Sequence, residues 1–189
     1  DLIASCPNHM NPALSYLDPA HVGSLKVYAG ISPVSLGGDS IGGTIVAQSR
    51  APEFAPAGQG LLARGEIGAF YRSNGNGYGG NAAATLATEN LNVTYVGAYA
   101  KADNYKAAGN FKTTTATGRL GHTLPLDEVG STAYTTINQK LGFAIKGGDH
   151  LVEGSFGFQN VPEQLYPNQR MDMLDNDQKT FNLRYLGQF

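Results

Sequence analysis

The sequence contains little sulfur and little charge, and both shortages restrict the class of protein. It has one cysteine and three methionines in 189 residues, and charged residues make up 15% of the chain. A single cysteine excludes an internal disulfide framework. The net charge is −2, and no basic patch points to nucleic acid. We therefore expect neither a disulfide-dependent fold nor a nucleic-acid partner.

Long hydrophobic runs are also absent. No apolar run approaches the ~18 residues of a membrane helix. Membrane β-strands remain possible, because each one carries only about 10 residues of alternating polarity. The chain is rich in glycine (25), tyrosine (10) and phenylalanine (8), a composition that favours strands and turns over helices.

From residue 60 onward, apolar and polar residues alternate over long segments. This period of two predicts β-strands. The expected strands are at 61–73, 92–103, 132–146, 150–160 and 179–189, with a weaker, alanine-rich strand at 78–89. They are long against the usual length of about 5–6 residues. An antiparallel all-β region of about six strands is therefore expected.

The connections between these strands differ in length. Tight turns are expected at 89–92 and 146–150, and longer loops at 104–131 and 161–178, at the end where the short first turn 73–77 also lies. Short turns at one end and longer loops at the other are typical of an outer-membrane barrel, whose apolar face meets lipid. Six strands cannot close a barrel, since about eight is the lower limit, so further strands or a partner sheet are expected. A soluble or surface β-sandwich binding module alternates equally well and stays as an alternative.

The first 58 residues have a different character. They hold six of the nine prolines and two short apolar segments, at 25–30 and 43–49. LGGDSIGG (36–43) lies between these segments, and its glycine pairs permit tight turns. Residues 51–60 have the composition of a linker. We expect this part to form a separate unit that leads into the long strands.

All the sulfur falls into two short clusters, at CPNHM (6–10) and MDM (171–173). Cys6 and Met10 share one face if their segment turns helically, and Met171 and Met173 share one side of an extended loop. Thiolate and thioether ligands are soft and select Cu(I) or Ag(I) over Zn(II). The alternative is that the clusters are incidental.

Residues 27–52, VYAGISPVSLGGDSIGGTIVAQSRAP, resemble the end of the plug domain of TonB-dependent receptors. CPNHMNPALSYLDP (6–19) is similar to the copper-receptor branch of that family, whose plug carries a C-x-x-x-M motif. The resemblance implies an all-β fold, with the C-terminal part of a plug domain at 1–58. The first six strands of a 22-stranded transmembrane β-barrel would follow at 59–189. The front of the plug, the TonB box and the remaining strands would lie outside this sequence.

The same resemblance implies a function and an orientation. The chain would belong to a transporter in the outer membrane of a Gram-negative bacterium that binds and imports copper. Its partners would be membrane lipid and a TonB-type energy-coupling protein. The long loops would be extracellular, with the 171–173 cluster in the third of them, facing the plug apex. The implied copper ligands are Cys6, Met10, Met171 and Met173.

One departure from the family leaves the fourth ligand open. The copper receptors carry His-x-Met in the barrel loop, whereas this chain has Met171-x-Met173. The fourth ligand can be Met171 or His9, or it can be absent, and in a helix His9 points about 100° away from Met10. A TonB-dependent receptor for a siderophore or another ligand is the alternative within the family. We expect no enzymatic activity, because no Ser/His/Asp or paired-carboxylate arrangement has usable spacing.

Overall fold

The computed structural model describes residues 19–31, 34–36, 42–167 and 172–187. Within these ranges the chain forms eight β-strands and three short 3₁₀ helices, η2 (Pro19–His21), η3 (Val34–Leu36) and η4 (Asn74–Asn76). No helix in the described part of the chain is long and apolar enough to cross a membrane. The strands form two separate sheets, one of two strands and one of six.

The small sheet is an antiparallel hairpin of β1 (Ser24–Ala29) and β2 (Gly43–Gln48). These strands coincide with the two apolar segments expected in the first 58 residues. Gly43 begins β2 at φ 126°, with the Tyr28 carbonyl oxygen 2.6 Å from where a Cβ would lie, so glycine is required there. After β2, residues 49–61 contain no strand, as the linker composition predicts.

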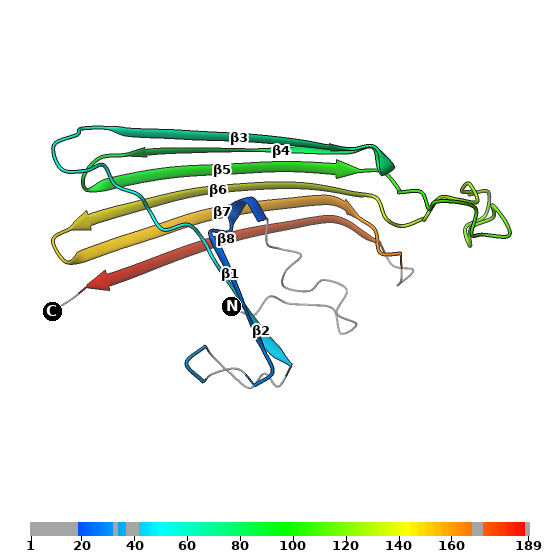
Figure 1. Cartoon of the computed structure of the whole chain (residues 1–189), viewed down its shortest axis with the longest axis horizontal. Coiled ribbons are helices and arrows are strands. Elements are labelled where there is room, and N and C mark those ends of the chain that lie inside the picture. The colour runs from blue at the N-terminus through cyan, green and yellow to red at the C-terminus, as the bar shows by residue number, and fades with distance from the viewer. Residues whose placement is uncertain (1–18, 32–33, 37–41, 168–171, 188–189) are drawn as a thin grey trace.

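The large sheet consists of six antiparallel strands in sequence order. They are β3 (Leu62–Arg72), β4 (Gly77–Ala87), β5 (Leu91–Ala102), β6 (Tyr134–Gly147), β7 (His150–Gln164) and β8 (Met173–Gly187). The short connections 88–90 and 148–149 lie at one end of the sheet, here called the turn end (Figure 1). Residues 73–76, 103–133, 165–167 and 172 lie at the opposite end, called the loop end. The predicted number and order of the six strands, and the predicted alternation of short and long connections, are confirmed.

The strand register separates two faces of the six-stranded sheet. Residues directly opposite one another on neighbouring strands project to the same face. One such row is polar or small: Arg64, Thr85, Thr94, Gly142, Ser155 and Asn182. The next row along the strands is apolar or small: Gly65, Ala84, Tyr95, Leu141, Phe156 and Phe181. The first row belongs to the face that contacts residues 49–55, called the linker face, and the second to the opposite, open face.

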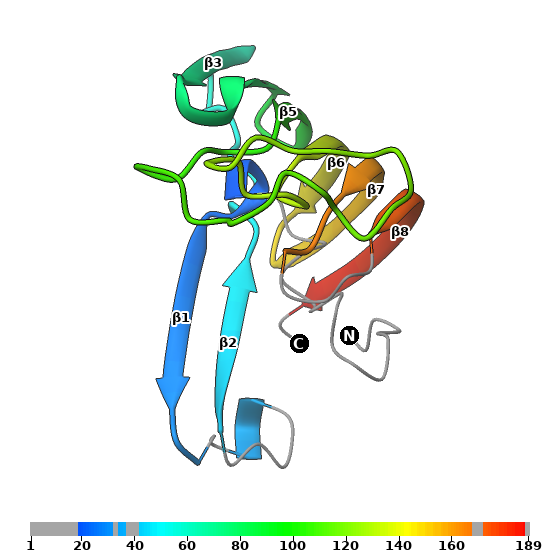
Figure 2. The same ribbon diagram turned by 90° about the vertical axis from the view of Figure 1, so that its right-hand side faces the viewer.

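The distribution of exposure is the reverse of that in a soluble globular protein. The large exposed apolar side chains include most of those on the open face, such as Leu141, Phe156 and Leu183. Buried side chains among the described residues instead include the polar Asn92, Asn138 and Gln159, all on the linker face. The hairpin and the linker lie on this second side, toward which the sheet curves (Figure 2). The polar face is therefore the occupied one, and the apolar face is uncovered.

Strands β7 and β8 are longer than the alternation predicts. The expected loop at 161–178 shrinks to 165–172, because β7 continues to Gln164 and β8 already begins at Met173. The added segments, 161–164 and 173–178, lie at the loop end and contain few apolar residues, with Met173 and Leu174 adjacent, so they lack the period-two signal. Pro162 and Asp175 (φ 56°) are left out of the β7–β8 pairing without a change of register, since proline has no N–H to donate. The β6–β7 register shifts at the same end, between Thr135 and Ile137.

The long connection 103–133, called the loop arm, extends beyond the loop end (Figure 1). Its base is closed by Asn104, whose side-chain oxygen accepts hydrogen bonds from the amides of Thr132 (2.9 Å) and Ala133 (3.1 Å). The side chain of Asn74, in the β3–β4 turn, pairs with both backbone groups of Lys106 at 2.7 and 2.8 Å. The arm is thus attached to the sheet by directed hydrogen bonds.

The open face yields a prediction that separates a lipid-facing sheet from a soluble one. Phe156 and Ser155 are neighbours on β7 and project to opposite faces. In the full-length protein we expect Phe156→Arg to lower the free energy of unfolding by about 2–4 kcal/mol, the usual cost of a cation facing mid-bilayer lipid. Ser155→Arg adds the same charge on the polar face and should cost much less. Unfolding in phospholipid bilayers measures both, and equal small costs would contradict lipid contact.

Candidate functional site

Of the four predicted metal ligands, only Met173 is placed by the structure. Cys6, Met10 and Met171 lie outside the described residues, as does the alternative ligand His9. The prediction of Met173 in a loop is wrong, because Met173 is the first residue of β8. The reason is the one given above: the loop-end segment of β8 has no apolar alternation by which a strand could be recognised.

The ladder determines the direction in which Met173 projects. Met173 pairs with Gln164 on β7, and Gln164 pairs with Tyr134 on β6. Gln164 and Tyr134 both line a cavity of about 220 Å³, together with Thr132, Asn138 and Gln159. The β6–β7 register shifts by one residue between Thr135 and Ile137, so the alternation of faces along β7 changes there. Through its pairing with Gln164, the Met173 side chain is therefore assigned to the linker face at the loop end, and it is half-buried.

Acidic residues flank Met173 at positions 172, 175 and 177. Asp172 is paired with Arg119 from the loop arm at 2.8 Å. Asp177 accepts a hydrogen bond from the side chain of Asn160 at 2.6 Å. Over the described ranges, no three His, Cys, Asp or Glu side chains gather as a metal site. A conventional nitrogen–oxygen site is therefore absent from that part of the chain.

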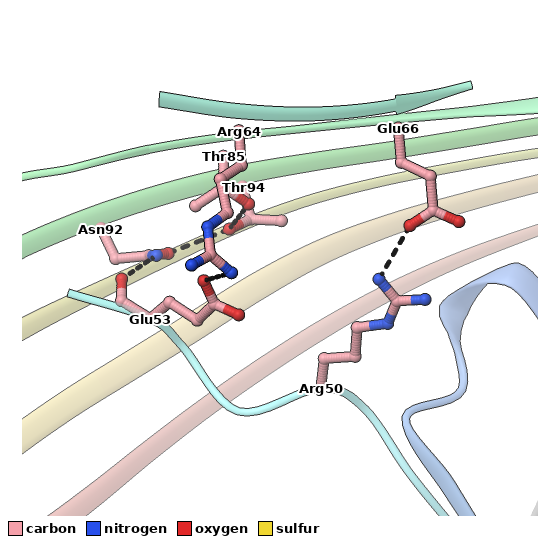
Figure 3. A network of polar contacts seen from close by, with 7 residues as sticks. All are labelled: Arg50, Glu53, Arg64, Glu66, Thr85, Asn92 and Thr94. Carbon is pink, nitrogen blue, oxygen red and sulfur yellow. Dashed lines mark hydrogen bonds and ion pairs between the residues drawn. The ribbon is translucent and has the colours of Figure 1, made fainter. Parts of the chain in front are cut away.

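A second group of polar contacts holds the linker to the sheet (Figure 3). Arg50 pairs with Glu66 at 3.2 Å, and Glu53 pairs with Arg64 at 2.8 Å. Both ion pairs join the linker to β3, and all four side chains are more than half exposed. Exposed ion pairs contribute only about 0–1 kcal/mol each, so they orient the linker more than they stabilise it.

Asn92 makes the stronger attachment. Its side chain is 2% exposed, and its Nδ2 donates to the Glu53 carbonyl oxygen at 2.6 Å. Its Oδ1 accepts from the Thr94 hydroxyl at 3.1 Å. Ala55 lies buried nearby in the chain, and its amide donates to the Thr88 carbonyl at 3.0 Å. An asparagine that is buried and satisfied on both sides holds the linker in one register.

Sequence reasoning did not find this role. The only local signal is that Asn92 is polar at the start of a strand, which a solvated turn explains equally well. Its burial depends on Glu53, 39 residues earlier, and on Ala87 and Ala144, which are buried opposite it on β4 and β6. The small side chains of these two alanines leave room for the linker to approach the sheet.

Closer to the hairpin, a cavity of about 150 Å³ lies between β2 and the strands β6 to β8. Its lining is rich in amides and hydroxyls, including Gln48, Asn138, Gln159, Gln178 and Asn182. Lys140 on β6 donates from Nζ to the Ser49 hydroxyl at 2.6 Å. This wall has the polar character of an aqueous lumen and carries no sulfur ligand.

Together these features define a class of fold: a hairpin unit bound to the polar face of a partial β-barrel sheet whose other face is apolar. A solved structure described as the copper transporter OprC is similar to the chain, with a TM-score of 0.75 and 22% identity. The similarity covers 97% of this chain and 25% of that one. No family model matches the sequence, and no curated protein matches it.

This likeness concerns the fold. The predicted fold class, an all-β chain with part of a plug followed by six antiparallel barrel strands, is confirmed. The domain boundary at residues 58 and 59 stays a prediction, as does the complete metal-ligand set. Because the chain spans only a quarter of the length of the similar structure, activity, cargo and partners are matters for proposal.

Two substitutions that should lower the free energy of unfolding by different amounts test how the linker is attached to the sheet. We expect Asn92→Ala in the full-length protein to lower the free energy of unfolding by about 1–3 kcal/mol, because it removes both hydrogen bonds of a buried side chain, to the Glu53 carbonyl and the Thr94 hydroxyl. Arg50→Ala removes only an exposed ion pair and should cost at most about 1 kcal/mol. Denaturant titration of the refolded protein measures both. A loss for Asn92→Ala no larger than that for Arg50→Ala would contradict the ranking.

Proposed function

We propose that this chain is part of an outer-membrane TonB-dependent transporter that captures and imports copper. The observation that carries the membrane part of the proposal is the reversed polarity of the sheet. An apolar face left uncovered, opposite a polar face that carries the hairpin and linker, suits a barrel wall with lipid outside and a plug inside. The fold likeness to a transporter supports the same assignment.

A soluble β-sandwich accounts less well for this arrangement. In a sandwich, the apolar faces of two sheets pack together and the polar faces meet water. In the described part of this chain, the segment that packs on the large sheet lies against its polar face instead, through Ser49, Arg50, Glu53 and Ala55. A sandwich would leave these contacts on its solvated side.

The chemistry of the candidate ligands supports copper as the cargo. Thioethers and thiolates prefer Cu(I), and Met173 projects by register to the linker face, where a plug lies in such a barrel. The proposed site joins Cys6 and Met10 of the plug with Met171 and Met173 of the barrel. His9 is the alternative to Met171. Energy for import would come from a TonB-type protein that acts on the plug.

The metal content of the full-length protein tests this site. Purified with copper present, the wild type should hold copper, and Cys6→Ala or Met173→Ala should lower its copper affinity by at least about tenfold, which is 1.4 kcal/mol. The reason is that each change removes one of only three or four soft ligands. Leu174→Ala is a matched control, because Leu174 pairs with Glu163, follows Met173 on β8 and is exposed.

Two results would contradict the proposal in different ways. Unchanged copper content in both ligand variants would place the metal elsewhere. Binding of a ferric siderophore in place of copper, unaffected by these variants, would favour the alternative receptor.

Metal selectivity gives an independent test. Because the proposed ligands are sulfur atoms, Ag(I) should compete with copper, whereas Zn(II) in similar excess should not. Competition followed by elemental analysis of the purified protein measures this selectivity. Displacement of copper by Zn(II) would point to nitrogen and oxygen ligands, such as histidine and carboxylate.

A further inference from the structure

The ion pair between Arg119 and Asp172 joins two connections that are far apart in sequence. Arg119 belongs to the loop arm between β5 and β6, and Asp172 lies in the connection between β7 and β8, immediately before Met173. The guanidinium Nη2 donates to Asp172 Oδ2 at 2.8 Å. Figure 2 shows the loop arm passing across the loop ends of the later strands. The Arg119–Asp172 ion pair attaches the loop arm to the connection before β8.

Arg119 is carried by an ordered part of the arm. Backbone hydrogen bonds pair Leu124 with Thr115 at 2.9 Å and Thr117 with His122 at 3.2 Å. The Thr117 hydroxyl also contacts His122 Nδ1 at 3.0 Å. These pairs form a small hairpin whose tip is residues 118–121. Arg119 therefore lies at the tip of a hydrogen-bonded hairpin. The position of this backbone, together with the long arginine side chain, brings the guanidinium to Asp172.

Asp172 depends on this partner. Its side chain is only 14% exposed, whereas that of Arg119 is 74% exposed. The second carboxylate oxygen, Oδ1, is buried and has no hydrogen-bond partner in the described part of the chain. A half-buried carboxylate that loses its cation keeps its desolvation cost without compensation. Removing Arg119 should therefore displace Asp172 toward water, together with the adjoining start of β8.

The residue next to Asp172 is the one predicted metal ligand that the structure places. Met173 forms the last pair of the β7–β8 ladder, with Gln164, so no further strand pairing holds it from the loop side. We propose that the Arg119–Asp172 pair is a latch that positions Met173 for metal capture and closes the loop arm over it. This proposal rests on the proposed copper function. Arg119 is a positioning residue, since it acts through Asp172 and touches no cargo.

The position of the loop arm can be measured without copper. Chymotrypsin cuts after Phe111, which is exposed on the arm. Arg119 is not among the residues that flank this bond, so changes at Arg119 leave the cleavage site itself unaltered. In full-length protein in outer membranes, Arg119→Ala should be cleaved there at least about threefold faster, because cleavage follows the population of the released arm. Arg119→Lys keeps the charge and should remain near the wild-type rate. Cleavage of Arg119→Ala at the wild-type rate would overturn the latch.

Reversal of the charges provides the decisive comparison. Arg119→Asp alone and Asp172→Arg alone place like charges together and should both release the arm. The double variant restores an opposite pair and should return the cleavage rate toward that of the wild type. If the double variant is no slower in cleavage than the two single variants, the contact is not an attractive pair and the proposal fails.

Copper binding supplies the second readout. Arg119→Ala should weaken copper affinity by about tenfold, the usual scale for a residue that orients a ligand, and Arg119→Lys should restore most of it. Lys106→Ala is the matched control, because it removes a cation from the same arm and leaves Asp172 paired. Unchanged copper affinity in Arg119→Ala, with a released arm, would overturn the positioning role.

The two proposals can fail separately. Met173→Ala should lose copper while its loop arm is cleaved at the wild-type rate, because the latch does not involve the thioether. A wild-type protein that binds no copper would defeat the copper function. In that case, faster cleavage of Arg119→Ala would still establish the pair as the anchor of the arm.

Discussion

The reversed polarity of the six-stranded sheet is the constraint on which the rest of the structure depends. Antiparallel pairing places each row of side chains on one face, so the alternation along six strands adds up to one apolar and one polar surface. Buried polar side chains then require partners. Asn92 has its partner in the linker, and Gln159 Nε2 donates to Asn138 Oδ1, whereas Gln159 Oε1 has no partner in the described part of the chain. The apolar surface needs no polar partner, and the described segments leave it uncovered.

The linker attaches the preceding hairpin to this polar surface. The exposed ion pairs to β3 limit its direction, while Asn92 and the small alanines beside it determine how closely it approaches. A larger residue at Ala144, which is fully buried, would separate the linker from the sheet. The hairpin is thereby held at a point about halfway across the sheet, through Lys140 and Ser49.

The loop end combines the features relevant to capture. Met173 projects to the linker face there, beside a cavity lined by amides and hydroxyls. The loop arm reaches the residue beside Met173, because Arg119 pairs with Asp172.

The sequence by itself determined the six strands, their order and the alternation of short and long connections, because each follows from local period-two patterning and turn residues. Patterning failed where β7 and β8 extend beyond the apolar band, since the few apolar residues of these strand ends do not alternate with polar ones. It therefore placed Met173 in a loop. Only the tertiary structure decided that Asn92 is buried, that Asp172 is paired and that Met173 projects to the linker face. These properties depend on register and on contacts between residues tens of positions apart, which no local pattern records.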